Sequence, residues 1–495
     1  MLVVAAGLQT AVLPPLQAAT PEKRITDSGI KAAFLRELVL QKGGSRNEVE
    51  VSTRQGIVTL SRSVDDLVAK DRLVKLAESI RGVLGVIDLT TVTPVSRSDE
   101  DLRKDIQTAL RQDPATESYS VNVSVRSAVV TLTGSVGYYP EKQLATRLAH
   151  GVKGVKAVRN QVSIDYLGKR TDPAIAADVN ARLRWDIWVS GGRINSTVTD
   201  GKVTLSGTIG SAIGRSRAFD DVWVNGVISV DDSGLQIDPS PRHEVSRELK
   251  SAARSNSVVK HAILAAFRLD PRVAIFSPDV NVEDGMVVLD GTVGNLKARS
   301  AAEQDAKNIV SVSRVVNLLT VRLTAWPSDA DMQNQLKAAV LRDSLLARSA
   351  IDVAVIHRVA YLSGAVDSFY QKSEARDVAS RIKGMVEVRN HLRVEPDFAA
   401  GINQWPNYFS EDEPLATSSA TMEPESHLSD AQVKKDIENS LFWSPFVDRD
   451  AIKVTVDGSV ATLTGSVGTW IGYEEADQDA HKGGAAAVCN RLEVK

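Results

Sequence analysis

Residues that could carry out chemistry are few and scattered in this chain. Its only cysteine is Cys489, and its histidines lie at unrelated positions: His150, His243, His261, His357, His391, His427 and His481. A zinc site needs several such ligands at short, regular spacing, and a nucleophile needs a base within reach. The chain also lacks Gly-x-Ser-x-Gly, a phosphate-binding glycine loop ending in Lys-Ser/Thr, and His-Glu-x-x-His. We therefore expect no catalytic residues, no metal site and no cofactor.

Large aromatic side chains are the remaining candidates for a contact surface. Trp185 and Trp188 lie near the end of a predicted helix, Trp443 and Phe446 occupy a similar stretch, and Trp470 follows a predicted hairpin. Aromatic rings beside arginine can lie at a lipid interface, where an apolar body and a polar rim both find partners. The same rings can fill gaps between adjacent small domains. The sequence leaves both interpretations open: contact with lipid or a partner, and interdomain packing.

Length and charge narrow the class of protein. The chain has 495 residues, of which 43% are hydrophobic, and this length favours several domains over one core. Lys and Arg number 59 against 62 Asp and Glu, a net charge of −3. A protein built to coat nucleic acid would show a strong basic excess, so we expect no nucleic-acid partner.

The first twenty residues differ from the rest of the chain. Residues 1–20 carry no charge, are rich in Leu, Val and Ala, and end in small residues at Ala18 and Ala19. This pattern is typical of the apolar and cleavage regions of a secretory signal peptide, so we expect export to the periplasm. A disordered apolar tail is the alternative. After residue 20 no apolar run approaches the roughly 20 residues that span a bilayer.

One short pattern recurs six times along the chain. It reads Val-Thr-Leu-Thr-Gly at 130–134 and varies little elsewhere, with a leucine two residues before its last position and a β-branched residue two after. We call that last position the marker; it is occupied by Arg62, Gly134, Gly207, Gly291, Gly364 and Gly465. Apolar residues two apart face the same side of a sheet, so each pattern predicts a strand with one buried face.

The surroundings of the marker complete a unit of about 70 residues. Pairs such as Asp200-Gly201, Asp284-Gly285 and Asp457-Gly458 predict a hairpin turn just before each pattern. Small residues recur 11 and 15 positions after the marker, as at Ala145 and Ala149, and predict a helix lying close on a sheet. A last strand carries an Asn or Asp, to which we assign a structural hydrogen-bonding role, and another helix precedes each hairpin. Each unit is therefore predicted as helix–strand–strand–helix–strand.

These residues resemble the BON domain, a bacterial envelope module. The resemblance rests on the V-x-L-x-G-x-V strand, the Asp-Gly hairpin, the alanine-rich second helix and the last strand, seen as Gly-Val-Lys-Ala-Val-Arg-Asn at 154–160. It implies an α+β fold: six tandem small αββαβ domains, each a three-stranded sheet covered by two helices. The predicted boundaries are 1–20 for the signal peptide, 26–94, 98–167, 172–238, 255–325, 328–395 and 428–495 for repeats 1 to 6, and 396–427 for a linker.

Several positions depart from the pattern. Arg62 replaces the marker glycine in repeat 1, and His357-Arg358 replaces the hairpin Asp-Gly in repeat 5. Drift among redundant repeats explains these changes, with functional divergence as the alternative. Residues 396–427 hold six acidic residues and no Lys or Arg, which predicts a flexible acidic tether. We expect proteases to cut this tether first and to release repeat 6 as a folded fragment.

The resemblance carries no catalytic residues with it. It implies a non-enzymatic periplasmic protein that binds membrane phospholipid or envelope proteins and acts in envelope or osmotic stress. Two alternatives stay open: a chaperone-like stress protein that holds unfolded clients, and a protein that binds a small ion or solute. The identity of the ligand and the oligomeric state do not follow from the residues.

Overall fold

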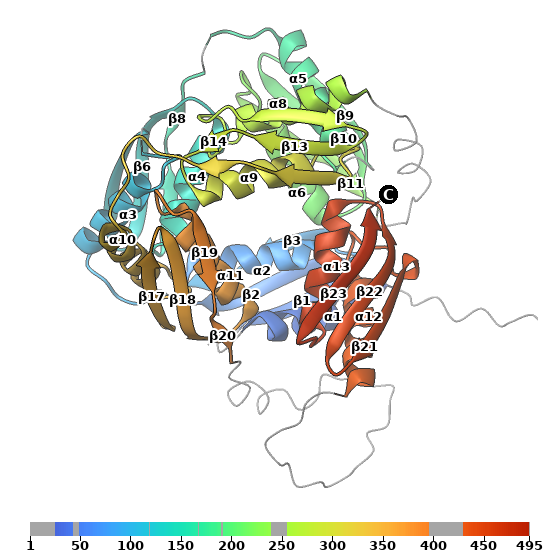
Figure 1. Cartoon of the computed structure of the whole chain (residues 1–495). Helices are drawn as coiled ribbons and strands as arrows, with labels where there is room; N and C mark the ends of the chain where they lie inside the picture. Colours follow the sequence, from blue (N-terminus) through green and yellow to red (C-terminus); the bar gives the residue numbers. More distant parts are fainter. Residues whose placement is uncertain are drawn as a thin grey trace, which may run out of the picture.

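The computed structural model describes residues 25–42, 49–117, 119–166, 168–189, 192–238, 255–395 and 429–494. The predicted signal peptide and the predicted acidic linker lie outside these residues. The described residues form six α+β units of the predicted order, which confirms the fold class (Figure 1). None of their helices combines the length and the apolar character needed to cross a membrane.

Repeat 1 shows the plan that all units follow. It contains α1 (Asp27–Lys42), β1 (Val49–Arg54), β2 (Ile57–Val64), α2 (Leu67–Glu78), β3 (Gly85–Asp88) and β4 (Thr91–Val92). The strand that carries the marker, β2, is central: it pairs antiparallel with β1 and parallel with β3 and β4. The pattern Val-x-Leu-x-x-x-Val thus occupies the middle of each small sheet, where both neighbours shield its backbone.

The other five units repeat this order. Repeat 2 has α3 (Asp99–Gln112), β5 (Ser120–Arg126), β6 (Val129–Val136), α4 (Tyr139–His150), β7 (Ala157–Asn160) and β8 (Ser163–Ile164). Repeat 3 has α5 (Asp172–Trp185), β9 (Arg193–Thr199), β10 (Lys202–Ile209), α6 (Ala212–Asp221) and β11 (Ser229–Ile237). Repeat 4 has α8 (Asn256–Leu269), β12 (Asp279–Glu283), β13 (Met286–Asp290), β14 (Thr292–Val293), α9 (Leu296–Lys307), β15 (Arg314–Asn317) and β16 (Thr320–Val321).

The last two units complete the set. Repeat 5 has α10 (Asp329–Arg342), β17 (Ala350–Ile356), β18 (Val359–Val366), α11 (Phe369–Arg381), β19 (Glu387–Asn390) and β20 (Arg393–Val394). Repeat 6 has α12 (Asp430–Trp443), η3 (Arg449–Ala451), β21 (Ile452–Asp457), β22 (Val460–Val467), α13 (Trp470–Lys482) and β23 (Ala487–Val494).

Repeats 3, 4, 5 and 6 each have their own small hydrophobic core, whereas the cores of repeats 1 and 2 are continuous with each other. The leucine two residues before the marker has no exposed surface in any repeat: Leu60, Leu132, Leu205, Leu289, Leu362 and Leu463. The predicted helix alanines are equally buried, as at Ala145, Ala149, Ala375 and Ala379. Because alanine has so small a side chain, the second helix lies close against the central strand, as the sequence predicts.

The backbone conformation at the marker position favours glycine. It has φ between 113° and 123° in repeats 2 to 6, a region that residues with a Cβ avoid. A Cβ on Gly134 would lie 2.0 Å from the carbonyl oxygen of Ser120. Arg62 meets the same demand in repeat 1 with a φ of 78°, and its guanidinium pairs with Glu50 at 3.2 Å. This φ is smaller than that of the marker glycines and lies close to the left-handed helical region, which residues other than glycine occasionally adopt.

An acidic or amide residue at the start of each first helix holds the hairpin turn. Asp99, for example, accepts hydrogen bonds from the backbone N–H groups of Ser127 and Ala128, both at 2.8 Å. The equivalent side chains are Asp27, Asp172, Asn256, Asp329 and Asp430, each 35 residues before its marker. The turn predicted at Asp457-Gly458 is in fact Gly458-Ser459, the two residues with positive φ and the two amides that Asp430 holds.

The recurring Asn or Asp of the last strand has the structural role predicted for it. In repeat 2 the side chain of Asn160 accepts from the N–H of Val162 at 3.0 Å and donates to the carbonyl of Lys142 at 2.9 Å. This local turn ends β7 and starts β8, so the single last strand expected from sequence is split in repeats 1, 2, 4 and 5. The same amide ties the split strand to the second helix.

The six units surround a central space with their second helices turned inward and their sheets outward (Figure 1). Repeats far apart in the sequence lie side by side. Backbone hydrogen bonds join repeat 1 to 6, repeat 2 to 5 and repeat 3 to 4. The chain therefore folds back on itself in three nested pairs.

All three pairs use one contact, which we call the helix-end bridge. The N–H groups of Arg81, Lys153 and Val310, just after a second helix, donate to carbonyls at the end of the partner repeat's first helix, at 2.8–2.9 Å. Those carbonyls belong to Trp443, Arg342 and Trp185. In two pairs a reciprocal bond follows, from Ser344 to Gly151 and from Ile187 to Asn308. Repeat 6 has Pro445 at the equivalent position, and proline has no N–H to donate.

Candidate functional site

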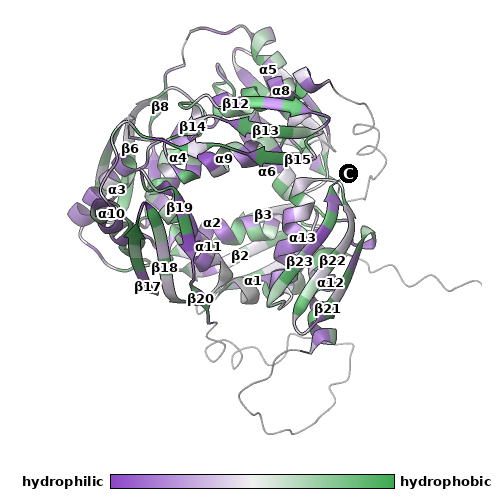
Figure 2. Cartoon of the chain, in the orientation of Figure 1, coloured by the Kyte–Doolittle hydropathy of each residue, from purple (hydrophilic) through white to green (hydrophobic). Residues whose placement is uncertain are grey.

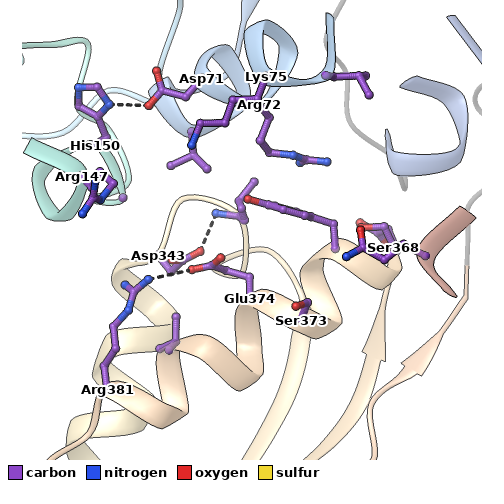
Figure 3. Close-up of a pocket in the computed structure, with 18 of the residues that line it drawn as sticks. Asp71, Arg72, Lys75, Arg147, His150, Asp343, Ser368, Ser373, Glu374 and Arg381 are labelled. Carbon is purple, nitrogen blue, oxygen red and sulfur yellow. Dashed lines mark hydrogen bonds and ion pairs between the residues drawn. The ribbon is translucent and has the colours of Figure 1, made fainter. Parts of the chain in front are cut away.

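A cavity of about 1090 Å³ lies at the centre of the molecule. Residues from repeats 1, 2, 5 and 6 line it, together with Ile213 of repeat 3. Figure 3 shows three of its walls: α2 with Asp71, Arg72 and Lys75, the end of α4 with Arg147 and His150, and α11. Because the lining residues come from several repeats, no single repeat encloses this space.

The second helices bring charged side chains to the cavity. Their alanines face their own sheets, so positions on the opposite side of the same helix face the centre. There α2 contributes Asp71, Arg72 and Lys75, α4 contributes Arg147 and His150, α11 contributes Glu374 and Arg381, and α13 contributes Glu475 and Lys482. Figure 2 shows hydrophilic residues on the second helices around the central space. The cavity between the repeats is thus lined by charged as well as apolar side chains.

Contacts across the cavity join repeats that are distant in sequence. His150 of repeat 2 lies 2.8 Å from Asp71 of repeat 1, measured from Nδ1 to a carboxylate oxygen. The guanidinium of Arg72 lies 3.6 Å from the ring centroid of Tyr370 in repeat 5. Cation–π contacts of this kind gain strength where water is excluded. Repeat 1 is therefore held to two other repeats at the cavity wall.

Carboxylates beside the cavity are shifted towards their neutral form. Burial raises the pKa of Asp343, at the end of α10, to about 7, with Glu374 adding to the effect and Arg381 opposing it. Burial also raises the pKa of Glu475 to about 7, against the opposing charge of Lys482. Taking a carboxylate out of water disfavours its charged form, and the nearby cations offset only part of that cost.

The predicted aromatic contact residues lie between repeats. Trp443 is 6% exposed and packs into the core of repeat 1, although it belongs to repeat 6. Trp188 and Phe446 meet edge to face at 4.8 Å across repeats 3 and 6. Trp185 packs on the core of repeat 4, and Trp470 lies 5.2 Å from the ammonium of Lys307 in that repeat.

This placement agrees with the interdomain alternative drawn from the sequence. Lipid contact through these five residues stays a prediction, and in the closed arrangement it requires the repeats to separate. Sequence reasoning missed the charged residues that line the cavity. A signal was present: the faces of the alanine-rich helices opposite the alanines carry charged residues at equivalent positions, such as Lys75 and Arg147, and Glu374 and Glu475.

Metal ligands do not gather at the cavity or elsewhere among the described residues. No three His, Cys, Asp or Glu side chains there are arranged to hold a metal ion. The half-buried Cys489 lies in β23 and forms no disulfide.

Comparison with known proteins identifies the family of the repeats. The BON domain matches residues 26–94, 98–166, 171–239, 255–322, 328–396 and 429–495. Osmotically-inducible protein Y of Escherichia coli (strain K12) is 29% identical over 143 residues, which span 28% of this chain and 71% of that protein.

Solved structures give a weaker likeness. CdsD, a structural protein of the type III secretion system of Chlamydia trachomatis, is 16% identical, covers 44% of this chain and 97% of its own, and has a TM-score of 0.12. Its separate C-terminal domain covers 41% of this chain and 96% of its own at the same identity and TM-score. Since BON domains cover most of the sequence in six copies, the chain belongs to the BON domain family.

Proposed function

We propose that this chain is a non-enzymatic periplasmic binding protein that acts in osmotic or envelope stress by contacting membrane phospholipid. Family membership supports a stress role, because the similar protein of Escherichia coli is named as osmotically inducible. The uncharged stretch at residues 1–20 supports export. An exposed apolar edge in repeat 1 supports contact with a membrane.

This edge is formed by Leu84, Ile87 and Leu89 on and beside β3. Their exposed fractions are 36%, 48% and 61%. Repeat 2 has exposed Lys156, Arg159 and Gln161 at the equivalent positions. The fold thus accepts polar residues there, so packing does not account for the apolar side chains of repeat 1. Clustered exposed apolar residues are typical of interaction sites.

Co-sedimentation with vesicles tests the proposal. The probe is vesicles of phosphatidylethanolamine and phosphatidylglycerol, and the variant combines Leu84→Gln, Ile87→Gln and Leu89→Gln. We expect wild-type protein to pellet with the vesicles and the variant to lose at least fivefold in binding. The matched control, Lys156→Gln with Arg159→Gln in repeat 2, should lose far less. Equal binding by wild type and the triple variant would overturn the proposal.

The same samples separate the alternatives. A client-holding chaperone would suppress aggregation of a heated test protein without vesicles present, and the triple variant would weaken that suppression. The export part has its own measurement: N-terminal sequencing of protein recovered from the periplasm should give a start near residue 20. Recovery of uncleaved protein from the cytoplasm would contradict it.

A further inference from the structure

The junction between repeats 1 and 6 has the shortest of the three helix-end bridges. One backbone bond joins them, from the N–H of Arg81 to the carbonyl of Trp443, because Pro445 has no N–H for the reciprocal bond. The other two pairs of repeats have both bonds. The position of repeat 6 therefore depends more on side-chain contacts than the position of any other repeat relative to its bridge partner.

Side chains from repeats 1 and 6 meet around the ammonium of Lys482 on α13. The Nζ atom lies 2.9 Å from Asp479 and 4.0 Å from Glu475 on the same helix, and 3.5 Å from Glu37 on α1 of repeat 1. We call these four side chains the Lys482 cluster. In Figure 1, α1 and α13 lie side by side. The side chains of Glu37 and Asp479 are 5% and 4% exposed, so the cluster lies inside the junction.

The cluster holds more carboxylates than cations. Three carboxylates share the ammonium of Lys482, and the buried Oδ2 atom of Asp479 has no hydrogen-bond partner. The other charged groups that act on the cluster are Arg36 on α1, Asp436 on α12 and Glu474 on α13. Arg36 attracts both Glu37 and Asp436, and Glu474 is paired with Lys307 of repeat 4 at 3.0 Å. With every group ionised, like charges therefore face one another in the closed junction.

We propose that the Lys482 cluster is a proton-controlled latch, which holds repeat 6 against repeat 1 while it binds a proton and lets repeat 6 separate when that proton is lost as the pH rises. A bound proton neutralises one of the three carboxylates, so the remaining charges are closer to balance. Without the proton, repulsion between buried carboxylates opposes closure, and water around a separated repeat stabilises their charged forms. This regulatory role goes beyond the proposed membrane contact and does not rest on it.

The direction of the pH effect follows from the environment of the two glutamates. Burial raises the pKa of Glu475 to about 7; Lys482 opposes the shift, and Asp479 and Glu37 add to it. Burial also raises the pKa of Glu37. In an open form, a glutamate in water loses its proton at about pH 4. The closed form binds the extra proton between these values, so its advantage is complete below about pH 4 and is lost as the pH rises through about 7.

Separation of repeat 6 would open the central cavity. Phe446, Glu475, Gln478 and Lys482 of this repeat line the cavity, so removing them removes one of its sides. Opening also breaks the contact of Phe446 with Trp188 and the ion pair of Glu474 with Lys307, which both oppose release. The latch thus sets the pH at which solvent and solutes reach the interior of the molecule.

Small-angle X-ray scattering of the full chain at pH 6 and pH 8.5 tests the latch, with far-UV circular dichroism recorded on the same samples. We expect the radius of gyration of wild type to rise by at least a tenth at pH 8.5 with unchanged circular dichroism, because repeat 6 separates as a folded unit. Glu475→Gln should stay compact at both pH values, since an amide cannot lose the proton. The matched control is Glu493→Gln, at an exposed position of β23 in the same repeat, and it should open as wild type does.

A second variant shifts the latch in the other direction. Lys482→Gln removes the ammonium that attracts the three carboxylates, so this variant should open at a lower pH than wild type. Equal radii of gyration for wild type at the two pH values, or an equal rise in Glu475→Gln, overturns the proposal. A rise in wild type that is accompanied by loss of circular dichroism would show general unfolding and would also contradict it. No vesicles are present, so the result is independent of the membrane proposal.

Discussion

Asp343 illustrates a side chain that recurs at the end of the first helix. It accepts hydrogen bonds from the N–H groups of Leu345 and Leu346, and Asp113, Asp186 and Asp270 make the equivalent bond in repeats 2, 3 and 4. These carboxylates end the helix and also lie where repeats meet. The position suits the local backbone. Because packing of the repeats buries the carboxylate, however, its charged form is disfavoured.

The raised pKa of Asp343 predicts a stability that depends on pH. An unfolded Asp releases its proton near pH 4, whereas folded Asp343 keeps it to about 7. The folded state binds the extra proton between these values, so this group's contribution to the free energy of unfolding is complete below pH 4 and is lost as the pH rises to 7. Denaturant unfolding at pH 5 and pH 7.5 measures the loss.

Asp343→Asn keeps the acceptor oxygen and removes the titration. At pH 7.5 we expect this variant to be more stable than wild type by about 1–3 kcal/mol, and near pH 5 the difference should shrink. Asp352→Asn, an exposed site in the same repeat, should shift neither value. A wild-type advantage at pH 7.5 would show that the Asp343 charge stabilises the closed arrangement.

The helix-end bridge is the element that turns six small domains into one molecule. It uses backbone groups that every residue except proline provides, so it leaves no pattern of residue types beyond the absence of proline. Its acceptor carbonyls at Trp443, Arg342 and Trp185 end the first helices, where carbonyls lack intrahelical partners, and its donors follow the second helices. The bridge thus satisfies groups that an isolated repeat would leave to water.

Pro445 suggests a test of the bridge, because it marks a position where proline is tolerated. The preceding residue is extended in both repeats, with φ and ψ of −70° and 128° at Ser444 and of −66° and 133° at Asp343. Proline requires this backbone in the residue before it. Ser344→Pro should therefore fold but lose the bond to Gly151, at a cost of about 1 kcal/mol in denaturant unfolding.

The reverse change, Pro445→Ser, serves as the counterpart. It restores a donor at the pair of repeats 1 and 6, and we expect equal or higher stability. A loss of several kcal/mol from Ser344→Pro would mean that strain, and not the missing hydrogen bond, dominates.

The closed arrangement of the whole molecule changes what proteolysis should show. Cleavage between residues 396 and 427 was expected to release repeat 6. Trp443 packs into repeat 1, and Lys482 lies 3.5 Å from Glu37 of that repeat. We therefore expect the cleaved repeat 6 to stay bound and to co-elute with residues before 396 in size-exclusion chromatography.

Trp443→Ala provides the contrast. It removes the largest side chain of this contact and should cost about 3–5 kcal/mol, as truncation of a buried Trp does. The cleaved repeat 6 should then elute alone. If it elutes alone in wild type as well, the contact between repeats 1 and 6 is too weak to hold without the linker.

The amino-acid sequence by itself determined the unit and its number. Each repeated residue meets a local requirement: the marker glycine a positive φ, the paired alanines close packing, and the Asn or Asp of the last strand a turn. These requirements act over a few residues, so the residues recur once in every repeat. The Asp or Asn at the start of each first helix, 35 residues before each marker, is equally visible in the sequence but was not predicted as a site residue. Such signals arise within one repeat and therefore recur six times.

Only the tertiary structure decided how the six units meet. The nested pairs depend on backbone bridges that any residue except proline can make, and the cavity is lined by residues of several repeats. Side-chain contacts between repeats, unlike the backbone bridges, have no period, because each repeat meets different neighbours. That is also why the large aromatics allowed two interpretations in the sequence: whether Trp443 faces a membrane or the core of repeat 1 is set by the packing of distant segments.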